Sequence, residues 1–173
     1  MFSDGNVLTT NDKQMRFGRL RVGGNSGSQL LPLQVPFEAQ YWTGAFFETN
    51  IADTCTTLVA ANIGLGNYIG NLNAPETTVT AVTSPLQAGR GRITLSAPGA
   101  GNNGSVDVAV NLGPDPNADA CPAFAPAATA GDKDYLRGLW CTPPGTYTKD
   151  PAARARFGIL RSSDEAIYNR ENY

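Results

Sequence analysis

The chain has 173 residues, 19 glycines and 12 prolines, and only 16% of its residues are charged. The length predicts one domain, and the composition predicts many short strands joined by turns, because runs with helical periodicity are nearly absent. A net charge of −2 and a pI near 5.0 argue against nucleic acid or an anionic membrane as partner. No apolar run approaches the ~20 residues of a membrane span, and residues 1–15 lack the apolar centre of a signal peptide.

The first predicted elements are a polar segment and a bulged strand. Residues 1–14 are interpreted as a linker or a loosely held first strand, and residues 15–173 as a single β-sandwich domain. Residues 16–22 alternate between polar and apolar, but the apolar parity shifts at Gly18, which is typical of a β-bulge. The glycine- and serine-rich residues 23–28 then predict a turn.

The dominant feature of the sequence is a long alternating stretch at residues 30–42. Its apolar residues share one parity and its polar residues the other, which predicts a strand with one buried face. Pro32 and Pro36 lie on the polar parity and cannot donate to a ladder, so we expect an edge strand or one that changes partners partway along. An opposing sheet must cover the apolar face, so the fold class is all-β, an antiparallel β-sandwich of the immunoglobulin-like or jelly-roll-like type. The apolar positions are Leu31, Leu33, Val35, Phe37, Ala39 and Tyr41.

The middle of the chain predicts further strands. Residues 42–47 suggest a tight turn and a returning strand, and residues 77–82 a Thr/Val strand. The strongest local signal is a hairpin whose arms, 93–97 and 106–112, flank the turn 98–104 with its Asn-Gly pair.

The last part of the chain predicts a long surface excursion over residues 113–134, followed by closing strands at 154–160 and 166–168. Cys121 and Cys141 flank a Pro/Ala-rich irregular segment and are a candidate disulfide; in an oxidising compartment, closing such a loop is worth ~3 kcal/mol. The alternative is that all three cysteines are reduced. Cys55 has no local partner and could bridge to a neighbouring domain.

The sequence contains no constellation typical of an enzyme. With no histidine, the Ser-His-Asp and Cys-His mechanisms and histidine metal sites are excluded. The acidic residues are scattered, and no pair stands out as a glycosidase dyad. Asp115, Asn117 and Asp119 have the spacing of a calcium loop, but Ala120 and Pro126 stand where the loop needs glycine and glutamate. A loop rich in Asp, Asn and Pro explains these residues without a metal, so we expect no cofactor.

Arginine outnumbers lysine ten to three and recurs at alternate positions. If the strands pair, Arg19 and Arg21 would extend a ladder of guanidinium groups that binds polyanions or acidic glycans, beside Trp42 or Trp140 as a sugar-stacking platform. The alternative is that the arginines pair with carboxylates across strands and cover aromatic surface, and that the tryptophans pack in the core. The other clustered arginines are Arg16, Arg90, Arg92, Arg154, Arg156 and Arg161.

Several segments in order, among them RFGRLRV, SQLLPLQVPFEAQYW, LGNYIGNLNAPETT and AGRGRITLSAPGAGNNGSVDVAVNL, together resemble the C-terminal domain of the MSHA biogenesis protein MshQ and its relatives. The resemblance covers residues 15–173. It implies a domain of unknown function in a large, exported bacterial protein linked to a type IV pilus, and it brings no catalytic residues. Relatives often carry an acidic turn after the tryptophan; here residues 140–145 read WCTPPG, so a covalent Cys121–Cys141 clip replacing a metal clip is a further hypothesis.

We therefore expect a non-catalytic structural or adhesive C-terminal module, located extracellularly or at the cell surface. Its expected partners are the upstream domains of the same long chain and pilus or surface proteins, with self-association by strand exchange as a further possibility. The alternative function is a glycan-binding, lectin-like module that uses the Arg/aromatic surface.

Overall fold

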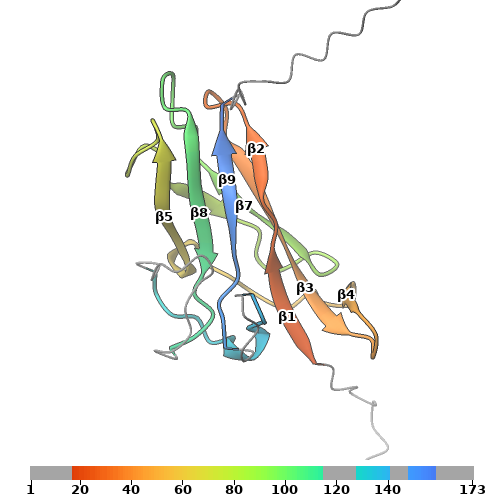
Figure 1. Cartoon of the computed structure of the whole chain (residues 1–173). Helices are drawn as coiled ribbons and strands as arrows, with labels where there is room; N and C mark the ends of the chain where they lie inside the picture. Colours follow the sequence, from red (N-terminus) through yellow and green to blue (C-terminus); the bar gives the residue numbers. More distant parts are fainter. Residues whose placement is uncertain (1–16, 115–127, 141–147, 159–173) are drawn as a thin grey trace, which may run out of the picture.

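The strands predicted from alternating residues assemble into two sheets packed face to face (Figure 1). The computed structural model describes residues 17–114, 128–140 and 148–158. The first sheet has the strand order β1-β3-β7-β6, with β4 also paired to β3; the second has the order β2-β9-β8-β5. The strands are β1 (Gly18–Val22), β2 (Asn25–Gly27), β3 (Leu33–Trp42), β4 (Phe47–Thr49), β5 (Ile63–Gly70), β6 (Val79–Val82), β7 (Arg90–Leu95), β8 (Gly104–Val110) and β9 (Ala152–Phe157), with short 3₁₀ turns η1 (Ala60–Asn62) and η2 (Asp134–Leu136).

This strand order is that of an immunoglobulin-like sandwich. Constant-type immunoglobulin domains place strands A, B, E and D in one sheet and C, F and G in the other. Here β1, β3, β7 and β6 take the places of A, B, E and D, and β5, β8 and β9 those of C, F and G. The all-β sandwich prediction is confirmed. The second sheet is mixed rather than purely antiparallel, because β2 pairs in parallel with β9.

Strand β3 is the long predicted strand, and it changes partners along its length. It pairs with β7 over Leu33–Glu38, with β1 over Phe37–Tyr41 and with β4 over Gln40–Trp42. Strand β3 is therefore central, not an edge strand. The Pro36 carbonyl accepts a hydrogen bond from Gly23 N on the β1 side. The Pro36 nitrogen faces the same side, just past the point where the pairing with β1 ends. Pro36 is tolerated because no strand there needs a hydrogen bond from its nitrogen.

The bulge predicted at Gly18 is wrong. Strand β1 pairs with β3 without a register shift, from Gly18 opposite Tyr41 to Val22 opposite Phe37. The parity change in the sequence arises because Phe17 lies on the outward face, where it is exposed.

The turn predicted over residues 23–28 contains a strand. The chain leaves the first sheet at Val22, crosses at Gly23 and Gly24, and joins the second sheet as β2. Gly24 lies close to the neighbouring backbone, since a Cβ there would be 3.0 Å from the carbonyl oxygen of Arg154. The crossing therefore depends on a residue without a side chain.

The predicted hairpin of residues 93–97 and 106–112 is also wrong. Strands β7 and β8 belong to different sheets, and each finds its hydrogen-bonding partners elsewhere: β7 on β3 and β6, β8 on β5 and β9. The connecting turn is real, with Gly99 and Gly101 at φ +97° and +88°. It links the two sheets because the apolar faces of both strands must meet in the core.

The core lies between the sheets. The inward residues of β3 and β7 pack against those of β8 and β9, so each sheet covers the apolar face of the other. The returning strand and the Thr/Val strand are confirmed as β4 and β6. The closing strand predicted at 154–160 is β9, which begins earlier, at Ala152, and ends at Phe157. Residues 1–14, 159–160 and 166–168 lie outside the described residues. In the described ranges, no helix is long and apolar enough to cross a membrane. Fully buried core residues include Leu20, Val35, Ile93, Leu95, Val106, Val108, Val110 and Phe157.

Candidate interaction surface on the first sheet

The outward face of the first sheet is built of cross-strand rows, because residues opposite each other in register share a face. Proceeding along β3 from its end toward its start, the rows change from aromatic to polar to charged. They are Phe17, Trp42 and Phe47; then Arg19, Gln40 and Thr49; then Arg21, Glu38 and Arg90; then Gly23, Pro36 and Arg92.

Arg19 lies between two aromatic rings. Its Cζ is 3.7 Å from the centroid of Phe47 and 4.7 Å from that of Trp140, and its Nε donates to Gln40 Oε1 at 2.8 Å. A planar guanidinium stacks well on such faces. Arg19 thus connects β1 and β4 to the segment that holds Trp140. Its guanidinium covers aromatic surface, as the alternative interpretation of the arginines expected, and does not extend a ligand-binding ladder.

Aromatic residues gather at this end of β3 and β4, and we call them the aromatic end: the exposed Phe17, Trp42 and Phe46 and the half-buried Phe47. Phe47 contacts Trp42 at a centroid distance of 5.1 Å and Phe17 at 6.0 Å. Phe17, Trp42 and Phe46 are 46%, 42% and 60% exposed. Figure 1 shows the β3–β4 corner beside the start of β1, so the aromatic end lies where the chain enters the sandwich.

Trp140 is more enclosed than Trp42. Its indole packs on Gly138, where an added Cβ would be 2.6 Å from the ring. Its Nε1 is buried and has no hydrogen-bond partner among the described residues. Of the two predicted stacking residues, Trp42 is therefore the more exposed.

Glu38 is the centre of a hydrogen-bonded group on the same face. Its Oε1 accepts from Gln40 Nε2 at 2.6 Å and from Arg21 Nη1 at 3.2 Å, and its Oε2 accepts from Thr49 Oγ1 at 2.8 Å. Burial raises the pKa of Glu38, but the hydrogen bonds from Thr49, Arg21 and Gln40 outweigh it, and the pKa lies below its ordinary value. Arg21 is thus paired with a carboxylate across the strand.

Beside this group the sheet face is hollowed. We call this feature the arginine hollow; it has a volume of about 590 Å³ and three arginines, Arg21, Arg90 and Arg92, in its wall. A two-residue turn, with Ala88 at φ +49° and Gly89 at φ +73°, places Arg90 at the edge of the hollow. The other lining residues include Pro36, Glu38, Thr83 and Gln87.

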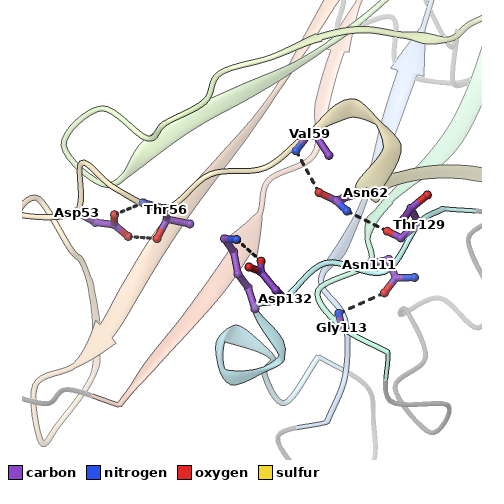
Figure 2. A network of polar contacts seen from close by, with 9 residues as sticks. Asp53, Thr56, Val59, Asn62, Asn111, Gly113, Thr129 and Asp132 are labelled. Carbon is purple, nitrogen blue, oxygen red and sulfur yellow. Dashed lines mark hydrogen bonds and ion pairs between the residues drawn. The ribbon is translucent and has the colours of Figure 1, made fainter.

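Polar residues that the sequence did not single out hold the loops at one end of the sandwich (Figure 2). Asn62 Oδ1 accepts from Val59 N at 3.1 Å, and its Nδ2 donates to the carbonyl of Thr129 at 3.0 Å. Asp53 accepts from the backbone and side chain of Thr56. Only the fold reveals these roles, because Asn62 and Thr129 are distant in sequence.

Two arginine–aspartate pairs, Arg154–Asp107 and Arg137–Asp150, are structural rather than available to a ligand. Both agree with the expectation that arginines pair with carboxylates. Neither aspartate was predicted to matter, since a single acidic residue in a strand or loop has no distinguishing pattern.

The remaining candidate residues fall mostly outside the described part of the chain. Cys121, Cys141 and the calcium candidates Asp115, Asn117 and Asp119 lie there, and their roles stay predictions. Within the described residues, no group of three or more metal-ligating side chains is gathered in one place. Cys55 is an exposed free thiol near Asp53 Oδ1.

Comparison with known families identifies the chain more closely. The family described as DUF6701, fourth domain, matches residues 16–172. The chain belongs to this family. The DUF6701 fourth domain is by its description a domain of unknown function within a larger protein, and the match spans both sheets of the sandwich. No curated protein and no solved structure matches the chain.

Proposed function

We propose that this DUF6701 fourth domain is a non-catalytic structural and adhesive module of a large exported bacterial surface protein. On this proposal the parent protein is related to the MSHA biogenesis protein MshQ and is associated with a type IV pilus. The module docks on the preceding domain of the same polypeptide through the aromatic end. The observation that carries this proposal is the position of two exposed aromatic residues at the start of β1: Phe17, and Trp42, whose backbone nitrogen donates to the Phe17 carbonyl.

The aromatic end has the properties of a docking surface. Contiguous exposed apolar side chains on a folded domain mark interaction sites more often than chance. Phe17 directly precedes β1, and Trp42 is the last residue of β3, so a domain joined to the start of β1 would lie beside both rings. Phe47 and Arg19 stack behind these rings and hold them in place, so little side-chain entropy is lost on docking.

A two-domain polypeptide, the preceding domain followed by this chain, tests the docking. We expect W42S/F46S to increase the radius of gyration in small-angle X-ray scattering and to speed amide exchange in β1 and β4. Ile69→Ser is the matched control, because Ile69 is an equally exposed apolar residue on β5 of the other sheet. Scattering and exchange that are identical in the three proteins would contradict the docking role.

A second candidate function is glycan binding at Trp42, favoured by the exposure of this residue beside polar side chains on the same sheet face. The test is a glycan array with mannose-type and acidic glycans, probed with the folded chain. Saturable binding that Trp42→Ala abolishes supports this function. Silence of the folded chain across the array contradicts it and leaves the docking role in place.

A further inference from the structure

We propose that the arginine hollow binds an acidic glycan, a saccharide chain bearing carboxylate or sulfate groups. This inference shares only the ligand class, a glycan, with the second candidate function, and places the ligand in the middle of the sheet face rather than at Trp42, so Trp42→Ala leaves this binding unchanged. It is independent of docking on a preceding domain.

The first step is the charge balance of the hollow. Three guanidinium groups face one carboxylate, that of Glu38, and both oxygens of Glu38 are already engaged by Arg21, Gln40 and Thr49. Arg90 lies opposite Glu38, and Arg92 lies opposite Pro36, which has no charge to offer. Among the described residues, neither guanidinium makes an ion pair. The hollow therefore carries two uncompensated positive charges on a chain whose net charge is −2.

The second step is geometry. Arg90 and Arg92 are two residues apart on β7 and point to the same face, so their Cα atoms are separated by ~7 Å. Each guanidinium offers a planar fork of donors that matches a carboxylate or sulfate group. The hollow's volume of about 590 Å³ lies within the ~300–1,000 Å³ range of ordinary ligand pockets. A ligand with acidic groups on neighbouring units can therefore engage both arginines.

The third step separates a glycan from an acidic peptide. The hollow lies on the face of β1, β3 and β7, whose backbone groups pair within the sheet, so a peptide cannot add there as a strand. Sugar hydroxyls need both donors and acceptors, and the wall provides them in Gln87 and Thr83 beside the arginines. The Pro36 ring adds an apolar surface against which a sugar ring can lie.

Calorimetric titration of the folded chain tests the proposal. The probes are a heparin-derived tetrasaccharide, an oligogalacturonate, neutral mannotetraose and a polyglutamate peptide. We expect the two acidic saccharides to bind and mannotetraose not to bind. Arg90→Gln and Arg92→Gln each weaken binding ~10-fold and the double variant ~100-fold, as expected for charge-assisted hydrogen bonds. Arg156→Gln, an exposed arginine on the second sheet, is the matched control and leaves the affinity unchanged.

Each other outcome overturns the proposal. If neither acidic saccharide binds, the arginine hollow is not a glycan site. If Arg156→Gln weakens the affinity as much as Arg90→Gln or Arg92→Gln, the binding is a general attraction between opposite charges. Polyglutamate binding as tightly as the saccharides, with the same loss in R90Q/R92Q, would make the ligand an acidic peptide. The two-domain scattering experiment separates this failure from that of the docking role, because R90Q/R92Q leaves the aromatic end unchanged.

Discussion

Arg154 of β9 and Asp107 of β8 face each other directly across the second sheet and form a two-point ion pair. Arg154 Nε lies 2.7 Å from Asp107 Oδ1, and Nη2 lies 2.7 Å from Oδ2. The Asp107 side chain is 1% exposed and that of Arg154 is 31% exposed. Asn67, which interrupts β5 at φ +49°, donates its side-chain amide to Asp107 Oδ2 at 3.0 Å. Asp107 thereby ties together three strands of the sheet.

We predict that Asp107→Asn lowers the free energy of unfolding by ~3 kcal/mol, because it leaves a partly buried guanidinium without its counter-ion. Urea denaturation followed by circular dichroism measures the change. Asn67→Ala removes only the neutral hydrogen bond, and we expect it to cost ~1 kcal/mol. Equal losses in the two variants would mean that the charge pairing adds nothing to the sheet.

The Arg137–Asp150 pair is buried more deeply, with both side chains 3% exposed. Arg137 Nε donates to Asp150 Oδ1 at 3.0 Å and its Nη2 to the carbonyl of Gly113 at 2.7 Å, while Asp150 Oδ1 also accepts from Leu112 N. We predict that Arg137→Met and Asp150→Leu each cost ~3–5 kcal/mol of stability, because each removes one partner of a buried ion pair.

The double variant R137M/D150L tests this interpretation. It removes both charges, so we expect it to lose much less stability than the sum of the two single variants, with a coupling energy above ~2 kcal/mol in a double-mutant cycle. Additive losses would show that the two groups act independently.

The stacking of Arg19 between Phe47 and Trp140 predicts a difference between arginine and lysine. Arg19→Lys keeps the charge but loses the planar stack and the hydrogen bond to Gln40, so we expect a loss of ~1–2 kcal/mol and a change in tryptophan fluorescence. Arg21→Lys is the control, because the exposed pair of Arg21 with Glu38 is worth ~0–1 kcal/mol. A greater loss from Arg21→Lys would contradict the stacking role.

Glu38 makes stability depend on acid pH. Its pKa in the folded chain lies below the ordinary value of 4.5. Its contribution to stability is therefore present above pH 4.5 and is lost as the pH falls through the folded-state pKa. We predict that the free energy of unfolding falls less steeply below pH 4.5 in Glu38→Gln than in the wild type.

Asp53 provides the comparison for this pH effect. Burial raises its pKa, but hydrogen bonds from Thr56 and Cys55 outweigh that effect and bring the pKa below 3.8, so its contribution is present above pH 3.8 and is lost as the pH falls through its folded-state pKa. Asp53→Asn should remove the part of the decline that begins below pH 3.8 and leave the part due to Glu38.

Identical pH profiles for the wild type and Glu38→Gln would show that Glu38 is not stabilised in its charged form.

The sequence by itself determined the local periodicity of the strands and hence the fold class. Alternation along residues 33–39 matches the buried and exposed faces of β3. The prolines predicted either an edge strand or a strand that changes partners, and the second of these is what β3 does. These features are visible in sequence because side chains alternate faces on every strand, whichever partner the strand has.

The tertiary structure alone decided which strands pair and which side chains meet. The Asn-Gly turn before β8 looks the same whether the flanking strands form a hairpin or cross between sheets, and burial of both apolar faces selects the crossing. Likewise, Arg19, Phe47 and Trp140 are far apart along the chain, so their stack exists only in the folded domain. The arginine hollow has the same origin, because Arg21 and Arg90 are neighbours only through the register that places Glu38 between them.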